Sequence, residues 1–132
     1  MRYLLDTDIC IYAINERPPA VLQAFRAHEA AGLGISSVTA AELFYGVART
    51  GSERNLRALR QFLAPLEIVP FDVAAAEVFG SLRAWLASQG TPIGPYDTQI
   101  AAQAQALGVT LVSNNIREFS RVPGLRVENW AI

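Results

Sequence analysis

Residues 4–12 read LLDTDICIY, and they place two carboxylates inside a run that is otherwise apolar. The apolar residues before the first carboxylate predict a strand over Tyr3–Asp6, of the kind that is buried on both faces of a parallel sheet. Asp6 then stands at the carboxyl end of this strand, where a charge is costly unless it is paired or binds a cation. In open α/β sheets ligands bind beyond the carboxyl ends of the strands. The stretch therefore predicts a parallel sheet and the edge of that sheet where function lies.

The rest of the chain alternates short apolar runs with helical stretches, which is typical of α/β folds. Further strands are expected at Gly34–Ser36, Glu67–Phe71, Thr110–Ser113 and Arg126–Glu128. Helices are expected over Ile9–Asn15, Pro19–Ala31, Val38–Arg49, Glu53–Leu63, Val73–Gln89 and Pro95–Leu107. No repeat, low-complexity tract or linker divides the chain. The prediction is one domain over residues 1–132, with a central parallel sheet of four to five strands covered by helices on both faces.

Composition excludes several classes of protein. The 132 residues carry 11 basic and 12 acidic side chains, a net charge of −1, so any polyanionic substrate must be attracted locally. All 11 basic residues are Arg. A single cysteine rules out an internal disulfide, and no apolar run reaches the roughly 18 residues of a membrane span. The N-terminus lacks the pattern of a signal peptide, so a cytoplasmic location is expected.

Two acidic residues have structural as well as functional interpretations. Asp8 immediately precedes the first expected helix and fits its N-cap. Glu42 is the only charged residue in SSVTAAELFYGVA, a helix apolar nearly all round. One alternative makes Glu42 the last member of a capping box that begins at Thr39. If Ser36 or Ser37 caps the helix instead, Glu42 lies deeper in it and has no capping task.

Asp97 lies in PIGPYDTQIAA, where Pro95 suits the first position of a helix. The free backbone N–H groups and the dipole of the first turn favour an ionised carboxylate there. Asp97 shares its helix face with the small apolar residues Ile100, Ala101 and Ala104, which are expected to pack on the sheet. Its carboxylate should therefore lean towards the buried side, although a first-turn Asp can also be a dipole partner and nothing more.

Asn114 and Asn115 follow the strand predicted at Thr110–Ser113 and have two interpretations. Such residues are ordinary turn formers, and their amide oxygens can also hold the water shell of a metal. Mg²⁺ suits a set of hard oxygen donors, because it binds one or two carboxylates and keeps several waters. Zinc and other transition metals do not suit the chain, since Cys10 and His28 are its only soft or imidazole ligands.

Four motifs in order, LLDTD, SSVTAAEL, PIGPYD before IAA, and VSNNIREFSRVPGLRVENW, resemble the PIN-domain ribonuclease toxins of the VapC type. The resemblance covers essentially the whole chain. It implies an acidic catalytic site at Asp6, Glu42 and Asp97, with Asn115 where many PIN domains carry a fourth Asp. Asp6 and Asp97 would bind Mg²⁺ directly, with Mn²⁺ able to substitute. Glu118 is a possible replacement for the missing fourth acid, and Asp8 would stand behind the metal ligands.

The resemblance also implies a fold and a biological role. The fold would be a three-layer α/β/α domain. The protein would be the toxin of a type II toxin–antitoxin system, a magnesium-dependent endoribonuclease inhibited by a cognate antitoxin. Antitoxins of this family lay an extended tail or helix into a hydrophobic groove near the active site. A homodimer, a larger assembly with the antitoxin and no association with membranes are expected.

Arginine side chains are the candidates for attracting RNA. One group comprises Arg54, Arg57 and Arg60 on the helix that follows Glu42, where a simple solvated helix face is the alternative. Arg117 and Arg121 flank the Asn115 loop and are the better candidates for phosphate contact, because they lie nearer the expected site.

Two other functions stay open from the sequence. The DTD that follows a first strand also fits a haloacid-dehalogenase-type phosphatase, but those enzymes ordinarily use a downstream Lys and this chain has none. The second alternative is a PIN-like module that binds RNA or protein without cutting, which Asn115 and the near-neutral charge keep open.

Overall fold

The computed structural model describes residues 1–132, and its centre is a five-stranded sheet in the order β3-β2-β1-β4-β5. All neighbouring strands are parallel. The strands span Tyr3–Leu5 (β1), Leu33–Ser36 (β2), Glu67–Val69 (β3), Thr110–Val112 (β4) and Val127–Glu128 (β5). The predicted parallel sheet of four to five strands is therefore confirmed, with β1 in the middle.

Burial of β1 explains why its sequence is uniformly apolar. Leu4 pairs with Gly34 on one side and with Leu111 on the other, so the strand has no free edge. Leu4 and Leu5 are completely buried and point into opposite cores, as successive residues of a strand must. A strand with both faces and both edges covered leaves no position for a polar residue before its end.

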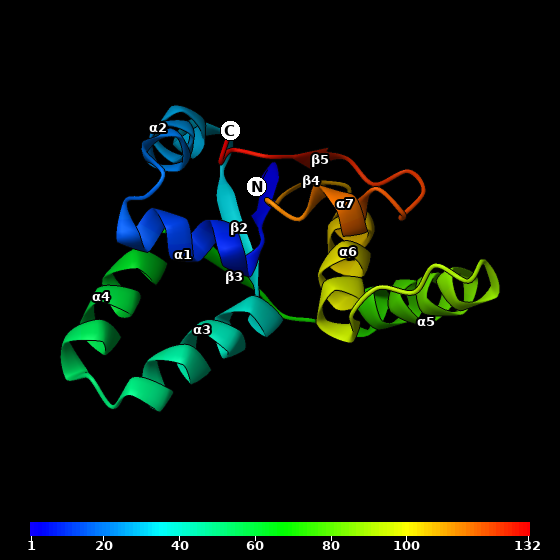
Figure 1. Ribbon diagram of the computed structural model, residues 1–132, viewed down its shortest axis with the longest axis horizontal. Coiled ribbons are helices and arrows are strands. Elements are labelled where there is room, and N and C mark those ends of the chain that lie inside the picture. The colour runs from blue at the N-terminus through cyan, green and yellow to red at the C-terminus, as the bar shows by residue number, and fades with distance from the viewer.

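Helices cover both faces of the sheet and make three layers (Figure 1). One layer consists of α1 (Thr7–Asn15), α2 (Pro19–His28), α3 (Ser37–Thr50) and α4 (Glu53–Leu63), with the 3-10 turn η1 at Glu29–Ala31. The other layer consists of α5 (Val73–Ser88), α6 (Pro95–Leu107) and the short α7 (Ile116–Phe119). A separate hydrophobic core lies under each layer, the first around Leu5 and the second around Leu4. The three-layer α/β/α architecture is confirmed.

The helix boundaries differ from the predicted ones where capping chemistry decides them. The first helix begins at Thr7, two residues earlier than predicted, because Asp6 is its N-cap and accepts a hydrogen bond from the Thr7 backbone N–H. Ser36 caps α3 in the same way through the backbone N–H of Val38, at 3.0 Å. The cap of α3 is thus the last residue of β2, and the cap of α1 directly follows the last residue of β1.

Two smaller differences have local causes. The strand β3 ends at Val69 rather than at Phe71, since Pro70 has no backbone N–H to continue the ladder. The helix α7 has only four residues and no side-chain N-cap, so it left no periodic pattern in the sequence. None of the helices combines the length and apolar character needed to cross a membrane.

Candidate active site

The carboxyl ends of three adjacent strands gather all four predicted site residues. Asp6 directly follows β1, and Asn115 lies just beyond β4. Glu42 is in the second turn of α3, the helix that begins at the end of β2. Asp97 is in the first turn of α6. Hydrogen bonds hold these side chains in one cluster, and their charges lie close enough to influence one another.

Asp6 is the most buried acid of the cluster, with 6% of its surface exposed. One carboxylate oxygen accepts the Thr7 backbone N–H at 2.8 Å, and the other accepts the buried hydroxyl of Ser113 at 2.8 Å. The Ser113 Oγ in turn accepts the backbone N–H of Asn115 at 2.9 Å. Ser113 therefore fixes the loop after β4 against the end of β1.

Glu42 is held in place by α1. The hydroxyl of Thr7 donates to Glu42 Oε1 at 3.1 Å, across the gap between the two helices. Since Ser36 caps α3, Glu42 does not close a capping box with Thr39. The alternative in which Glu42 has no capping task is therefore the correct one, and its carboxylate is close enough to Asp6 and Asp97 for their charges to influence one another.

Asp97 and Asn115 meet through their side chains. The Asn115 Nδ2 donates to Asp97 Oδ2 at 3.3 Å. Glu118, in the first turn of α7, lies close enough to Asp97 to help raise the pKa of that carboxyl. The structure thus brings Asn115 next to Asp97, and Glu118 approaches Asp97 from α7.

Asp8 was predicted to cap the first helix, and this was wrong. Asp6 caps that helix, so Asp8 lies in its first turn. Its two oxygens accept the backbone N–H groups of Ile9, at 2.7 Å, and Asn114, at 3.1 Å. Asp8 therefore binds α1 to the loop after β4 and stands behind the cluster, as the resemblance implied.

Four acids of the site, Asp6, Asp8, Glu42 and Asp97, are harder to ionise than usual. Burial raises the pKa of Asp6, although the bonds from Ser113 and Thr7 oppose the shift. Burial, with the Asp6 charge, raises the pKa of Asp8 to about 6. Burial, then Asp6 and Glu118, raise the pKa of Asp97 to about 7. For Glu42 the pKa is also raised, chiefly by burial. The crowded carboxylates repel one another and lack a countercharge.

A hydrated divalent cation fits this arrangement. The single ion pair within 4.0 Å in the structure joins Arg57 to Glu53 on α4, so no basic side chain neutralises the cluster. No three acidic, histidine or cysteine side chains stand close enough together to surround an ion by themselves. A few acidic oxygen donors suit Mg²⁺, which binds one or two carboxylates and retains water for the rest.

Three contributors to the site were missed in the sequence. Thr7 and Ser113 hold Glu42 and Asp6, and each could have been suspected from its place immediately after a strand. Arg49 lines the same groove as Glu42. The groove exists because of the way α3 packs against α1, and the sequence does not show this packing. Of the arginines predicted to contact RNA, Arg117 is exposed on α7, while Arg121 donates to the Pro92 carbonyl at 3.0 Å.

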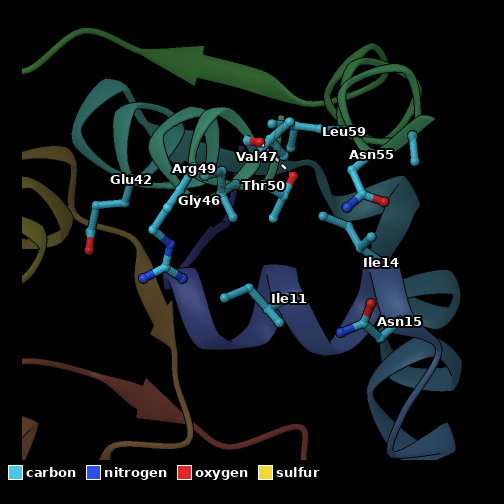
Figure 2. A pocket seen from close by; sticks show the side chains of 12 residues that line it. Ile11, Ile14, Asn15, Glu42, Gly46, Val47, Arg49, Thr50, Asn55 and Leu59 are labelled. Atoms are coloured by element: carbon cyan, nitrogen blue, oxygen red, sulfur yellow. Dashed lines mark hydrogen bonds between the residues drawn. The ribbon is translucent and has the colours of Figure 1, made fainter. Parts of the chain in front are cut away.

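The groove beside Glu42 lies between α1, α3 and α4 and has a volume of about 470 Å³ (Figure 2). Apolar side chains make half of its lining: Ile11, Ile14, Leu43, Val47, Ala58 and Leu59. The polar lining residues include Glu42 and Arg49. The acidic cluster therefore continues into an open, largely apolar channel.

Comparison with known proteins agrees with this geometry. Residues 3–125 match the family described as the PIN domain. The chain is 41% identical over 131 residues to a Salmonella typhimurium protein named tRNA(fMet)-specific endonuclease VapC, with 98% of each chain covered. It is 44% identical over 131 residues to ribonuclease VapC2 of Haemophilus influenzae, again with 98% of each covered.

Solved structures show the same fold. DNA-bound VapBC from Salmonella typhimurium superposes with a TM-score of 0.91 at 41% identity, over 98% of both chains. VapBC2 from Rickettsia felis, bound to a promoter DNA fragment, superposes with a TM-score of 0.90 at 41% identity, over 98% of this chain and 99% of that one. With its acidic residues gathered at the carboxyl ends of a parallel sheet, the chain belongs to the VapC branch of the PIN-domain family.

Proposed function

We propose that the protein is the toxin of a toxin–antitoxin pair and acts as a magnesium-dependent endoribonuclease. The observation that carries the proposal is the convergence of Asp6, Glu42 and Asp97 with Asn115, without any basic side chain among them. Such a cluster is electrostatically unfavourable by itself. It becomes favourable when a cation and a phosphodiester share the site.

The residues divide the work by their contacts. Asp6 and Asp97 would hold the ion, and Asn115, bonded to Asp97, would hold its water shell. When bound, Mg²⁺ lowers the pKa of a water and neutralises charge that develops on the phosphate. Glu42 is held by Thr7 and has a raised pKa, which suits it to take up the proton of the attacking water.

The groove supports the proposal that an antitoxin binds this protein. The VapBC structure from Mycobacterium tuberculosis is described as a member of a family of toxin-antitoxin systems. In the present chain, a channel of about 470 Å³ with an apolar lining opens beside Glu42. An apolar segment of an antitoxin laid in this channel would lie next to the catalytic acids and block access to them. Both proteins and the RNA would meet in the cytoplasm.

The test is RNA cleavage by matched variants. The first RNA to use is initiator tRNA, because a relative is named for it. Asp6→Asn and Asp97→Asn each remove one charge with little change of shape, and we expect either to reduce cleavage at least about a hundredfold. Glu77→Gln, on the exposed surface of α5, is the control and should cleave like the wild type. Expression of either Asp variant should no longer arrest growth.

The opposite outcome would point to the non-catalytic alternative. If the wild type binds RNA but neither it nor Asp6→Asn cleaves at any Mg²⁺ or Mn²⁺ concentration, the protein is a binding module. Cleavage that is equally fast with EDTA and with Mg²⁺ would refute the metal assignment while leaving the nuclease activity standing.

A further inference from the structure

Arg49 stands in a position that the proposed chemistry does not yet use. It lies in the last turns of α3 and lines the groove together with Glu42. Among the 11 arginines of the chain, it is the one that borders this groove. Figure 2 shows its guanidinium extended from α3 towards α1, on the same side of the groove as Glu42. A cation thus borders the acidic cluster without entering it.

The Arg49 guanidinium has no anionic partner. It lies more than 4.0 Å from every carboxylate, since Arg57 and Glu53 form the one ion pair of the structure. Its aromatic neighbour is the Tyr45 ring, whose centroid is 5.8 Å from Arg49 Cζ. A cation over an aromatic face is weakly held but directed. The five N–H donors of Arg49 therefore remain free for an anion.

The spacing along α3 fits a ligand that also reaches the catalytic acids. Glu42 and Arg49 are seven residues apart, which is two turns, so they project from one face of the helix about 10 Å apart along its axis. Long helical side chains lean towards the N-terminus, and this brings the guanidinium closer to Glu42. A phosphate near Arg49 would thus belong to the same strand as a phosphate held among the acids.

We infer that Arg49 binds a backbone phosphate of the RNA substrate, adjacent to the phosphodiester that is cut. The inference rests on the proposed nuclease function and extends it by naming where the strand leaves the site. The strand runs from the acidic cluster into the groove between α1 and α3. Arg49 is a binding residue in this arrangement and takes no part in the bond-breaking step.

The groove then has two occupants that exclude each other. An antitoxin segment seated on its apolar lining would cover Arg49 as well as Glu42. Inhibition would therefore act on substrate binding in addition to the catalytic acids. A toxin that loses the Arg49 contact should still form its complex with the antitoxin, because the apolar lining is unchanged.

The experiment measures RNA binding without cleavage. A fluorescein-labelled RNA stem-loop with single-stranded arms is titrated in EDTA, between about 50 and 200 mM salt. For Arg49→Gln we expect the Kd to rise about tenfold and the slope of log K against log salt to fall by about 0.7, the share of one phosphate on a single strand. Arg49→Lys keeps the charge and should keep the slope. Arg26→Gln, at an exposed position of α2 away from the groove, is the matched control and should behave like the wild type.

Cleavage kinetics supply a second readout. With Mg²⁺ present, Arg49→Gln should raise KM about tenfold and leave kcat within about twofold, because a contact made equally in ground and transition states is lost. If Arg49→Gln binds RNA with the Kd and salt slope of Arg26→Gln, the inference is wrong. A variant that binds RNA normally but loses its antitoxin would also overturn it. Failure of the wild type to bind or cleave RNA would instead count against the proposed function.

Discussion

Asp6 joins folding to function in one side chain. It caps α1 through the Thr7 backbone N–H and accepts the Ser113 hydroxyl, so both carboxylate oxygens already have protein partners. Each oxygen retains a further lone pair for a cation. Because these bonds fix the carboxylate on a buried strand end, a ligand meets it in a single orientation. The position of the site is thus determined by the same contacts that start the first helix.

Protonation of Asp97 gives a testable pH dependence. In the unfolded chain Asp97 has an ordinary pKa of about 3.9, whereas in the fold its pKa is raised to about 7. Between these values the folded state binds more protons than the unfolded state, so the free energy of unfolding falls as pH rises. Asp8, with a pKa of about 6, acts in the same direction. Thermal unfolding in EDTA should show lower stability at pH 8 than at pH 5.

The loss should be about 1 to 2 kcal/mol, allowing for screening by solvent at these partly exposed groups. Mg²⁺ should restore stability at pH 8 and have less effect at pH 5, where Asp97 and Asp8 are largely protonated. Asp97→Asn removes the titrating group and should flatten the pH profile of the metal-free protein. Stability that instead rises between pH 5 and pH 8 would show that the cluster carries no such strain.

Three helices begin at the site, and this favours its negative charge. The chain enters α1 directly from β1 and α3 directly from β2, while α6 begins at Pro95, two residues before Asp97. Each helix turns free N–H groups and the positive end of its dipole towards the acids. The same ends would also face the phosphates of a bound strand. Helix starts therefore offset part of the repulsion that the acids create.

The two serine caps permit a matched comparison. Ser36 caps α3, which carries Glu42, and Ser52 caps α4 by accepting the Asn55 backbone N–H at 3.1 Å. Ser36→Ala and Ser52→Ala should each lower the free energy of unfolding by about 1 kcal/mol. Only Ser36→Ala should also reduce kcat, by about tenfold, because the start of α3 positions Glu42. Urea unfolding would first confirm that both variants are folded. If their kcat values are then equal, the Ser36 cap does not orient Glu42.

Much of the site could be predicted because strand ends leave a mark in the sequence. One buried apolar run stops at Asp6, and another stops at Ser113, two residues before Asn115. These positions made Asp6 and Asn115 candidates without a structure. The exact cap could not be read, since Asp6 and Asp8 are equally good capping residues and only the helix register separates them. The role of Arg49 and the presence of the groove could not be predicted, because both depend on the distance between α1, α3 and α4 in the folded protein. No local pattern encodes that distance.

At the scale of the whole molecule, α5 is a long helix with only three buried residues, Ala75, Leu82 and Leu86. It packs mainly on α6 and projects at one end of the molecule (Figure 1). Its outer face is small and apolar, with exposed Ala76, Gly80 and Ala84, and Val73 at its start is 73% exposed. Such a face permits close approach of another helix. The homodimer expected from the sequence stays a prediction, and α5 is where we expect its interface.

Ala84→Arg tests this interface with little effect on the fold, because Ala84 is exposed. A long charged side chain at that point should block close helix packing and convert the dimer to a monomer at micromolar concentration. Ala27→Arg, at an exposed position of α2, is the control and should leave the mass unchanged. Light scattering coupled to size-exclusion chromatography gives the mass directly. A monomeric wild type would refute the homodimer, and a dimeric Ala84→Arg variant would place the interface elsewhere.

The hydrogen bond from Ser113 to Asp6 spans 107 positions of the chain. Strand β1 leaves the ribosome first, yet its neighbour β4 and the loop with Asn115 are among the last segments made. A growing chain therefore carries Asp6 long before it has a complete site. This order of synthesis means that the complete site forms only when translation of the chain is nearly finished.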